Sequence, residues 1–184
     1  MNIQNLTNQE KLFFDKQVDN ISKDINVDLS VLVKNIPDDN EILLLGENTH
    51  GTKEFYIHRS LITKFMIENM GYKVVLLEAE WPDIIRINNY IQGESVDNSA
   101  KESLRSIKQS SNWLWNNKVI CQLIEWLKEY NLHHPFNKVY VFGIDCQQFL
   151  KSIKFVLEYL KSYNHPYYEK TKLVLAIFRQ FITE

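Results

Sequence analysis

A glutamate, a histidine and an arginine lie within thirteen residues of one another, at Glu47, His50 and Arg59. An apolar run at 42–45 precedes them and ends at Gly46. The imidazole of a histidine has a pKa of about 6.5, so it can act as a general base at neutral pH, and a nearby carboxylate can orient it. An arginine can bind a carbonyl oxygen or the negative charge that develops on it. These residue types predict hydrolysis by a water that His50 activates.

The pattern around these residues predicts the elements that position them. Residues 42–45 are apolar without interruption, which is typical of a strand buried on both faces. The apolar spacing of residues 53–70 predicts a helix, and residues 73–77 predict a second buried strand. Residues 42–77 should therefore form a βαβ unit with parallel strands.

The rest of the chain continues this alternation. A third apolar run, at 139–142, predicts another strand, and helices are expected after Pro82, over 113–130, over 149–162 and from 169 onward. The predicted fold class is α/β, with parallel strands alternating with helices and a long helical insertion between the second and third strands.

Each of the three predicted strands ends close to an acidic residue. Glu47 follows the first strand, Glu78 and Glu80 follow the second, and Asp145 follows the third. Ligands of parallel α/β sheets bind outside the carboxyl ends of the strands, so these acids are expected to meet His50 on one rim. Glu78 should act in the site or orient the arginine. Asp145 should contact substrate or support its own loop, and the role of Glu80 stays open.

Four segments, in order over roughly residues 41–148, resemble the erythromycin esterase family, which opens macrolide lactone rings. The first is LGENTHGTKEF, followed after three residues by Arg59. The others are VVLLEAEWPDIIRINNYIQG, WLWNNKVICQLIEWLKEYN and VYVFGIDCQ. The resemblance covers only the front half of that family.

The resemblance implies a carboxylic-ester hydrolase that needs no metal or other cofactor. Its expected substrate is a lactone or another small ester, with macrolide resistance as the associated phenotype. The residues expected to be catalytic are His50, Glu47, Arg59 and Glu78, and Asp145 is expected to bind substrate.

The apolar spacing of residues 1–40 predicts short helices, and a turn cluster at 37–40 delimits them as an N-terminal helical prelude. The resemblance implies that residues 41–184 form the front half of an erythromycin-esterase-like α/β domain. Such a partial domain is expected to need either a missing C-terminal half or self-association.

Two other functions stay open. Glu47, His50, Glu78 and Asp145 also offer oxygen and nitrogen ligands for a divalent ion, as in a metal-dependent hydrolase. A chain that ends before the family's second half could instead be a truncated, non-catalytic remnant.

Composition argues against several other classes. A net charge of −2 gives no basic footprint for nucleic acid, and no apolar run approaches the ~18 residues of a membrane span. The amino terminus lacks the basic and apolar regions of a secretory signal, so the cytoplasm is the expected compartment. Cys121 and Cys146 are accordingly expected to be reduced.

Overall fold

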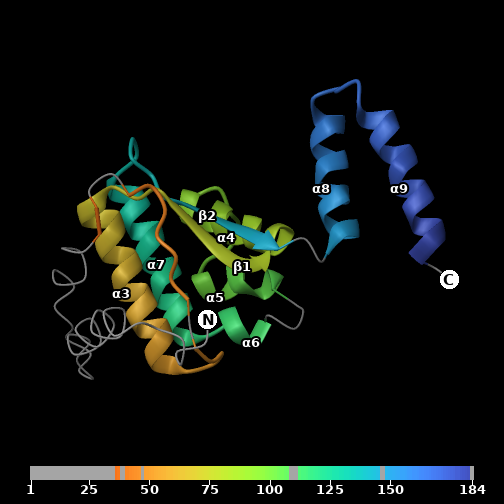
Figure 1. Cartoon of the computed structure of the whole chain (residues 1–184). Coiled ribbons are helices and arrows are strands. Elements are labelled where there is room, and N and C mark those ends of the chain that lie inside the picture. The colour runs from red at the N-terminus through yellow and green to blue at the C-terminus, as the bar shows by residue number, and fades with distance from the viewer. Residues whose placement is uncertain (1–35, 38–39, 47, 108–111, 146–147, 183–184) are drawn as a thin grey trace. The chain divides into compact units, whose positions relative to one another are not determined.

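The computed structural model describes residues 36–37, 40–46, 48–107, 112–145 and 148–182 of the 184-residue chain. The chain divides into two compact units between Tyr72 and Lys73. The first unit contains helix α3, and the second contains a parallel strand pair with the remaining helices that Figure 1 labels. Among the described helices, none is long and apolar enough to cross a membrane.

Helix α3 (Lys53–Met70) is the regular element among the described residues of the first unit, and its bounds match the prediction. Gly71 ends the helix in the left-handed conformation, with φ of 72°, and its N–H donates to the carbonyl of Met66. Glycine adopts this conformation without the steric cost that a Cβ would bring. The side chain of Tyr72 then donates a hydrogen bond of 2.6 Å to the carbonyl of Asn40, which ties the two ends of this segment together.

Residues 42–45, predicted as the first buried strand, are not a strand in the structure. Their backbone belongs to no ladder, and Ile42 and Leu44 are 72% and 87% exposed. An extended segment makes no internal hydrogen bonds, so an apolar run becomes a strand only where a neighbouring backbone pairs with it. The predicted βαβ unit over 42–77 is therefore wrong for its first strand, although its helix and second strand are present.

The sheet of the second unit consists of strands β1 (Val74–Glu80) and β2 (Tyr140–Asp145), which run parallel. The pairing is regular up to Leu77 opposite Gly143, and a register shift then brings Glu80 opposite Asp145. Strand β1 extends three residues beyond its predicted end at Leu77, so its two glutamates lie within the strand.

The close approach of the strands at this shift requires a glycine. A Cβ at Gly143 would lie 2.4 Å from the carbonyl oxygen of Ala79 and 2.8 Å from that of Glu80. Both contacts are with backbone atoms, which cannot move aside as a flexible side chain can. Gly143 therefore lets the carboxyl ends of β1 and β2 lie side by side.

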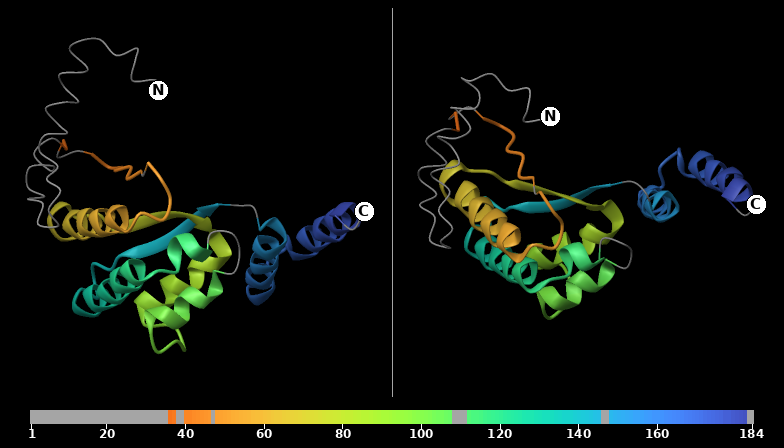
Figure 2. Two further views of the ribbon diagram at one scale, coloured as in Figure 1. Left: turned by 90° about the horizontal axis from the view of Figure 1, so that it is seen from below. Right: turned by 60° about the horizontal axis from the view of Figure 1, so that its bottom comes forward.

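Helix α4 (Trp81–Gln92) begins directly after β1 and packs against β2 and against α7 (Lys118–His133). Figure 2 shows α4 and α7 on the same side of the strand pair. The buried core lies between these elements and is formed by aliphatic side chains: Ile84, Ile87, Ile91, Leu127, Val139 and Val141.

The opposite face of the strand pair is exposed. Val74 and Leu76 are 50% and 58% exposed, and the rings of Tyr140 and Phe142 stack there with centroids 6.3 Å apart. The prediction that the second strand is buried on both faces is therefore wrong. A continuous apolar run shows that both faces are able to pack, but it does not show that both have a partner.

The predicted helical insertion between the strands is present. It contains α5 (Ala100–Ser103), the 3-10 helix η2 (Leu104–Ser106), α6 (Asn112–Trp115) and α7. The single helix predicted over 113–130 is divided at Asn117. The side-chain oxygen of Asn117 accepts hydrogen bonds from the next turn's N–H groups and so starts α7.

Two helices follow β2 and pack as a hairpin, α8 (Phe149–Ser162) and α9 (Tyr168–Ile182). The bounds of α8 match the prediction, and α9 begins one residue before the predicted position. The rings of Phe149 and Phe178 meet edge to face across the hairpin, with centroids 5.2 Å apart. The whole arrangement is a partial α/β domain, as predicted.

Candidate functional site

The first unit carries the predicted base and the predicted arginine. His50 lies in an exposed turn, and Gly51, with φ of 84°, leads from it into α3. Arg59 lies in the second turn of α3, and its guanidinium carbon sits 4.8 Å from the centre of the Tyr56 ring. This cation–π contact with a buried ring restricts the positions that Arg59 can adopt. Glu47, predicted to orient His50, lies outside the described residues.

The second unit carries the other predicted carboxylates at the ends of its strands. Glu78 is exposed, Asp145 is partly exposed and Glu80 is buried. In a regular strand, Glu78 and Glu80 would point to the same face, but the register shift between Leu77 and Glu80 gives them different surroundings. The structure therefore brings Glu80 and Asp145 together as ladder partners, while the carboxylate of Glu78 faces solvent.

A tryptophan holds the backbone of β1 beneath Glu78. The indole Nε1–H of Trp115 donates a hydrogen bond of 2.9 Å to the carbonyl of Glu78, and Trp115 is buried. A buried indole needs such a partner, and this one anchors the strand where Glu78 projects. The contact joins residues 37 apart in sequence, and nothing in the local pattern of either segment indicated it.

Beside the strand ends lies a buried polar cluster that the sequence did not reveal. An oxygen of Glu80 accepts from the backbone N–H of Gln148 at 2.9 Å, and an oxygen of Asp83 accepts from Gln148 Nε2 at 2.9 Å. Lys151 forms an ion pair with the other oxygen of Asp83. Glu80 and Asp83 are only 4% and 1% exposed, and carboxylates so buried are stable only with such partners.

Other polar groups of the second unit join its helices. Tyr90 donates to Glu125 at 2.7 Å, and the other oxygen of Glu125 accepts from the N–H of Ala100 at the start of α5. Burial, followed by the hydrogen bond to Glu125, raises the pKa of Tyr90. These contacts connect α4, α5 and α7 and do not involve the strand ends.

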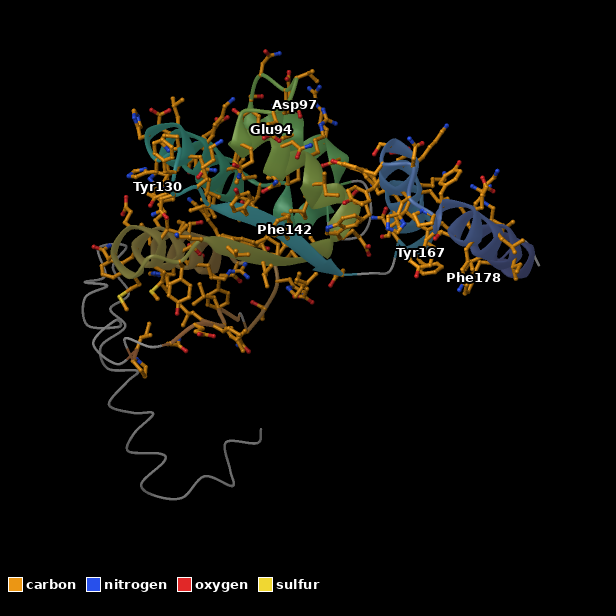
Figure 3. The ribbon with its side chains drawn as sticks, turned by 90° about the horizontal axis from the view of Figure 1, so that it is seen from above. Glu94, Asp97, Tyr130, Phe142, Tyr167 and Phe178 are labelled. Atoms are coloured by element: carbon orange, nitrogen blue, oxygen red, sulfur yellow. The ribbon has the colours of Figure 1, made fainter. Side chains whose placement is uncertain are left out.

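The buried carboxylate of Asp97, on the loop after α4, pairs with Arg86 of that helix, and Figure 3 shows Asp97 and Glu94 on this loop. Arg86 donates two hydrogen bonds to the carboxylate of Asp97, at 2.8 and 2.5 Å, and Ser95 donates a third at 2.9 Å. The hydrogen bonds from Arg86 lower the pKa of Asp97 from 3.8 to about 2, against the opposing effect of burial.

In the described part of the chain, no three His, Cys, Asp or Glu side chains are grouped so that they could hold a metal ion. The set that the sequence offered for a divalent ion includes Glu47, which lies outside this part. That alternative stays a prediction.

Parallel strands joined through helices, with polar groups at their carboxyl ends, define the α/β class whose ligands bind at the strand ends. Within this class, the chain belongs to the erythromycin esterase family, whose model matches residues 67–184. The resemblance of the sequence segments to that family is thus confirmed. The matched region includes Glu78 and Asp145 and begins after His50.

One curated relative and two solved structures show what the chain is similar to. The chain is 29% identical over 122 residues to erythromycin esterase type II of Escherichia coli, covering 66% of this chain and 27% of that protein. The structure of a succinoglycan biosynthesis protein has a TM-score of 0.69 at 24% identity, over 93% of this chain and 44% of that one. A Bacillus cereus protein has a TM-score of 0.54 at 22% identity, over 68% and 29%.

These comparisons support the fold and, separately, the general class of chemistry. The structural neighbours share the fold, and the family name supports hydrolase chemistry at the level of the family. The chain spans about a quarter of the esterase and less than half of the first structural neighbour.

Proposed function

We propose that this chain forms part of a hydrolase that opens a lactone or another small carboxylic ester. The observation that carries the proposal is the match to the erythromycin esterase family over residues 67–184, joined to the histidine-bearing turn that precedes it. An exposed imidazole on a turn is accessible to water and to substrate, as a general base must be.

In the proposed reaction, His50 removes a proton from a water molecule whose oxygen attacks the ester carbonyl carbon. Arg59 stabilises the negative charge that develops on the carbonyl oxygen. The carbon–oxygen bond of the ester then breaks, and the departing alkoxide takes the proton back from His50. The products are a carboxylic acid and an alcohol, and no oxidant, reductant or metal is needed.

The remaining predicted residues assist these steps. Glu47 orients the ring of His50 and stabilises its protonated form. Glu78, exposed near the carboxyl end of β1 and anchored through Trp115, positions the substrate. Asp145 contacts the substrate from the end of β2.

The test is hydrolysis of a panel of macrolides, simple lactones and aryl esters, with the addition of water followed by mass spectrometry. His50→Ala should lower the rate on the order of 10²–10⁴-fold, as loss of a general base does. Glu47→Gln should cost less, because the glutamine keeps the shape and loses only the charge. His58→Ala is the matched control, since His58 also lies in the first unit, on α3, and should leave the rate unchanged.

Three outcomes would contradict the proposal. Near-full turnover by a folded His50→Ala variant would remove the proposed base. Activity that disappears with a chelator and returns with a divalent ion would favour the metal-dependent alternative. The absence of turnover on every ester, with or without a family-type second half, would favour the non-catalytic remnant.

A further inference from the structure

Helix α8 is held to the body of the second unit by polar contacts more than by apolar burial. None of the residues of α8 is buried, so the transfer of side chains out of water contributes little to its position. A ring contact between Phe155 and Trp81, with centroids 6.0 Å apart, adds one edge-to-face interaction. The contacts at the start of this helix therefore decide where the hairpin lies.

The start of α8 is held by two carboxylates from the β1–α4 junction. Gln148 is bound twice, through its backbone N–H by Glu80 and through its side-chain amide by Asp83. Lys151, one turn further along, pairs with the second oxygen of Asp83. Both oxygens of a carboxylate that is 1% exposed are thus used to hold α8. We call these four residues the Asp83 clamp.

The Asp83 clamp acts on the same place in the fold as the strand ladder. Glu80 is the ladder partner of Asp145, and its side chain also binds the backbone of Gln148. The carbonyl of Gln148 accepts hydrogen bonds from the N–H groups of Lys151 and Ser152, both at 3.0 Å, and these bonds form the first turn of α8. The end of β2 and the start of α8 are therefore attached to one short stretch of the chain.

We propose that Asp83 and Glu80 are positioning residues, which hold the start of α8 and through it keep Asp145 at the strand ends. The part of this proposal that concerns substrate rests on the proposed function, which assigns substrate binding to Asp145. The structural part does not depend on any activity. Release of the clamp should free the α8–α9 hairpin and let the Asp145 end of β2 move while the core of α4 and α7 stays intact.

Hydrogen exchange followed by mass spectrometry tests the structural part. Asp83→Asn removes the charge that pairs with Lys151 and presents an amide N–H group to it, so peptides of α8 should exchange at least about tenfold faster, with α7 unchanged. Asp97→Asn is the matched control. It removes the charge of another buried carboxylate of the same unit, which pairs with Arg86, and should leave exchange in α8 unchanged.

Milder variants keep the test decisive if Asp83→Asn does not fold. Lys151→Met and Gln148→Ala alter partly exposed side chains and each remove one contact with Asp83. Each should accelerate exchange in α8 by roughly three- to tenfold. Unchanged exchange in α8 in every folded clamp variant overturns the proposal, as does equal acceleration in α7.

Kinetics on an ester that the chain hydrolyses test the positioning role. Asp83→Asn should raise KM about tenfold, leave kcat within about twofold and leave the pH profile unchanged, because a displaced Asp145 weakens binding without altering the base. An unchanged KM alongside loosened α8 overturns the role of the clamp in positioning Asp145. If the unmodified chain hydrolyses no ester, with or without a family-type second half, the proposed function fails, and the exchange experiment alone decides the clamp.

Discussion

Two apolar runs of this chain look alike in sequence and differ in structure. Residues 42–45 read ILLL and residues 74–77 read VVLL. The second run is the core of β1, paired in register with β2, whereas the first lies in no ladder and exposes Ile42 and Leu44. Composition made both runs able to form strands, and pairing decided which one did.

The difference extends to the residues that come after each run. After 74–77 come a register shift, a glycine on the facing strand and two buried carboxylates with partners. After 42–45 comes an exposed turn that carries His50. The second run thus leads into a strand end held by buried contacts, whereas the first leads into an exposed turn.

The largest expected effect is a loss of stability when a methyl group is added at Gly143, on the strand that faces the second run. Gly143→Ala would push a Cβ into the backbone of Ala79 and Glu80 and should destabilise the second unit by about 2–3 kcal/mol. Urea unfolding followed by tryptophan fluorescence measures this, because all four tryptophans lie in the second unit.

Gly46→Ala is the counterpart at the end of the first run. A Cβ there would meet nothing within 4 Å, so unfolding of the second unit should be unchanged. Equal stability of Gly143→Ala and the unmodified chain would show that the strand ends tolerate separation, and the contrast between the two runs would lose its structural basis.

The elements that the sequence predicted well are those whose signals are local. The helices over 53–70 and 149–162 have the predicted bounds because apolar spacing and end signals such as Gly71 lie within the segments themselves. The strand over 42–45 failed because a strand depends on a partner that can lie anywhere in the chain, and its own residues cannot specify one.

The same distinction separates the parts of the candidate site. The acids Glu78 and Asp145 were found because they end apolar runs, which is a local pattern. Asp83 was not found, because an acid in the first turn of a helix is ordinarily explained by the helix dipole. Its partners lie 65 and 68 residues away, and only the folded chain brings them together.

The second-largest expected effect is a loss of stability of the second unit in acid. The pKa of Asp97 is lowered from 3.8 to about 2 by Arg86, so the folded state favours the charged carboxylate. The resulting stabilisation is present above pH 4, is lost as the pH falls toward 2, and amounts to about 2 kcal/mol. Tryptophan-detected unfolding at a series of pH values should show this loss in the second unit.

Two substitutions test whether this loss of stability in acid comes from the Asp97 carboxylate. Asp97→Asn should unfold more easily at pH 7 and converge with the unmodified chain near pH 2. Glu129→Gln is the control, because Glu129 pairs with His133 at a solvent-exposed site and should change little. If Asp97→Asn kept the full acid dependence, other carboxylates would be responsible and the second unit would not owe this stability to the Asp97 pair.

The smallest expected effect concerns the surfaces that the two runs expose. Val74, Leu76 and Ile144 expose an apolar patch on the strand pair, whose outer edges pair with no other described strand, and such a patch favours association with another chain. The relatives contain further chain that could cover this patch, so we expect the chain alone to self-associate as its concentration rises.

Leu76→Lys should weaken that association about tenfold, measured by light scattering after size exclusion. Leu44→Lys should not, because Leu44 belongs to no strand ladder among the described residues. A monomer at all concentrations, or equal effects of the two substitutions, would mean that pairing in β1 creates no interaction surface that the first run lacks.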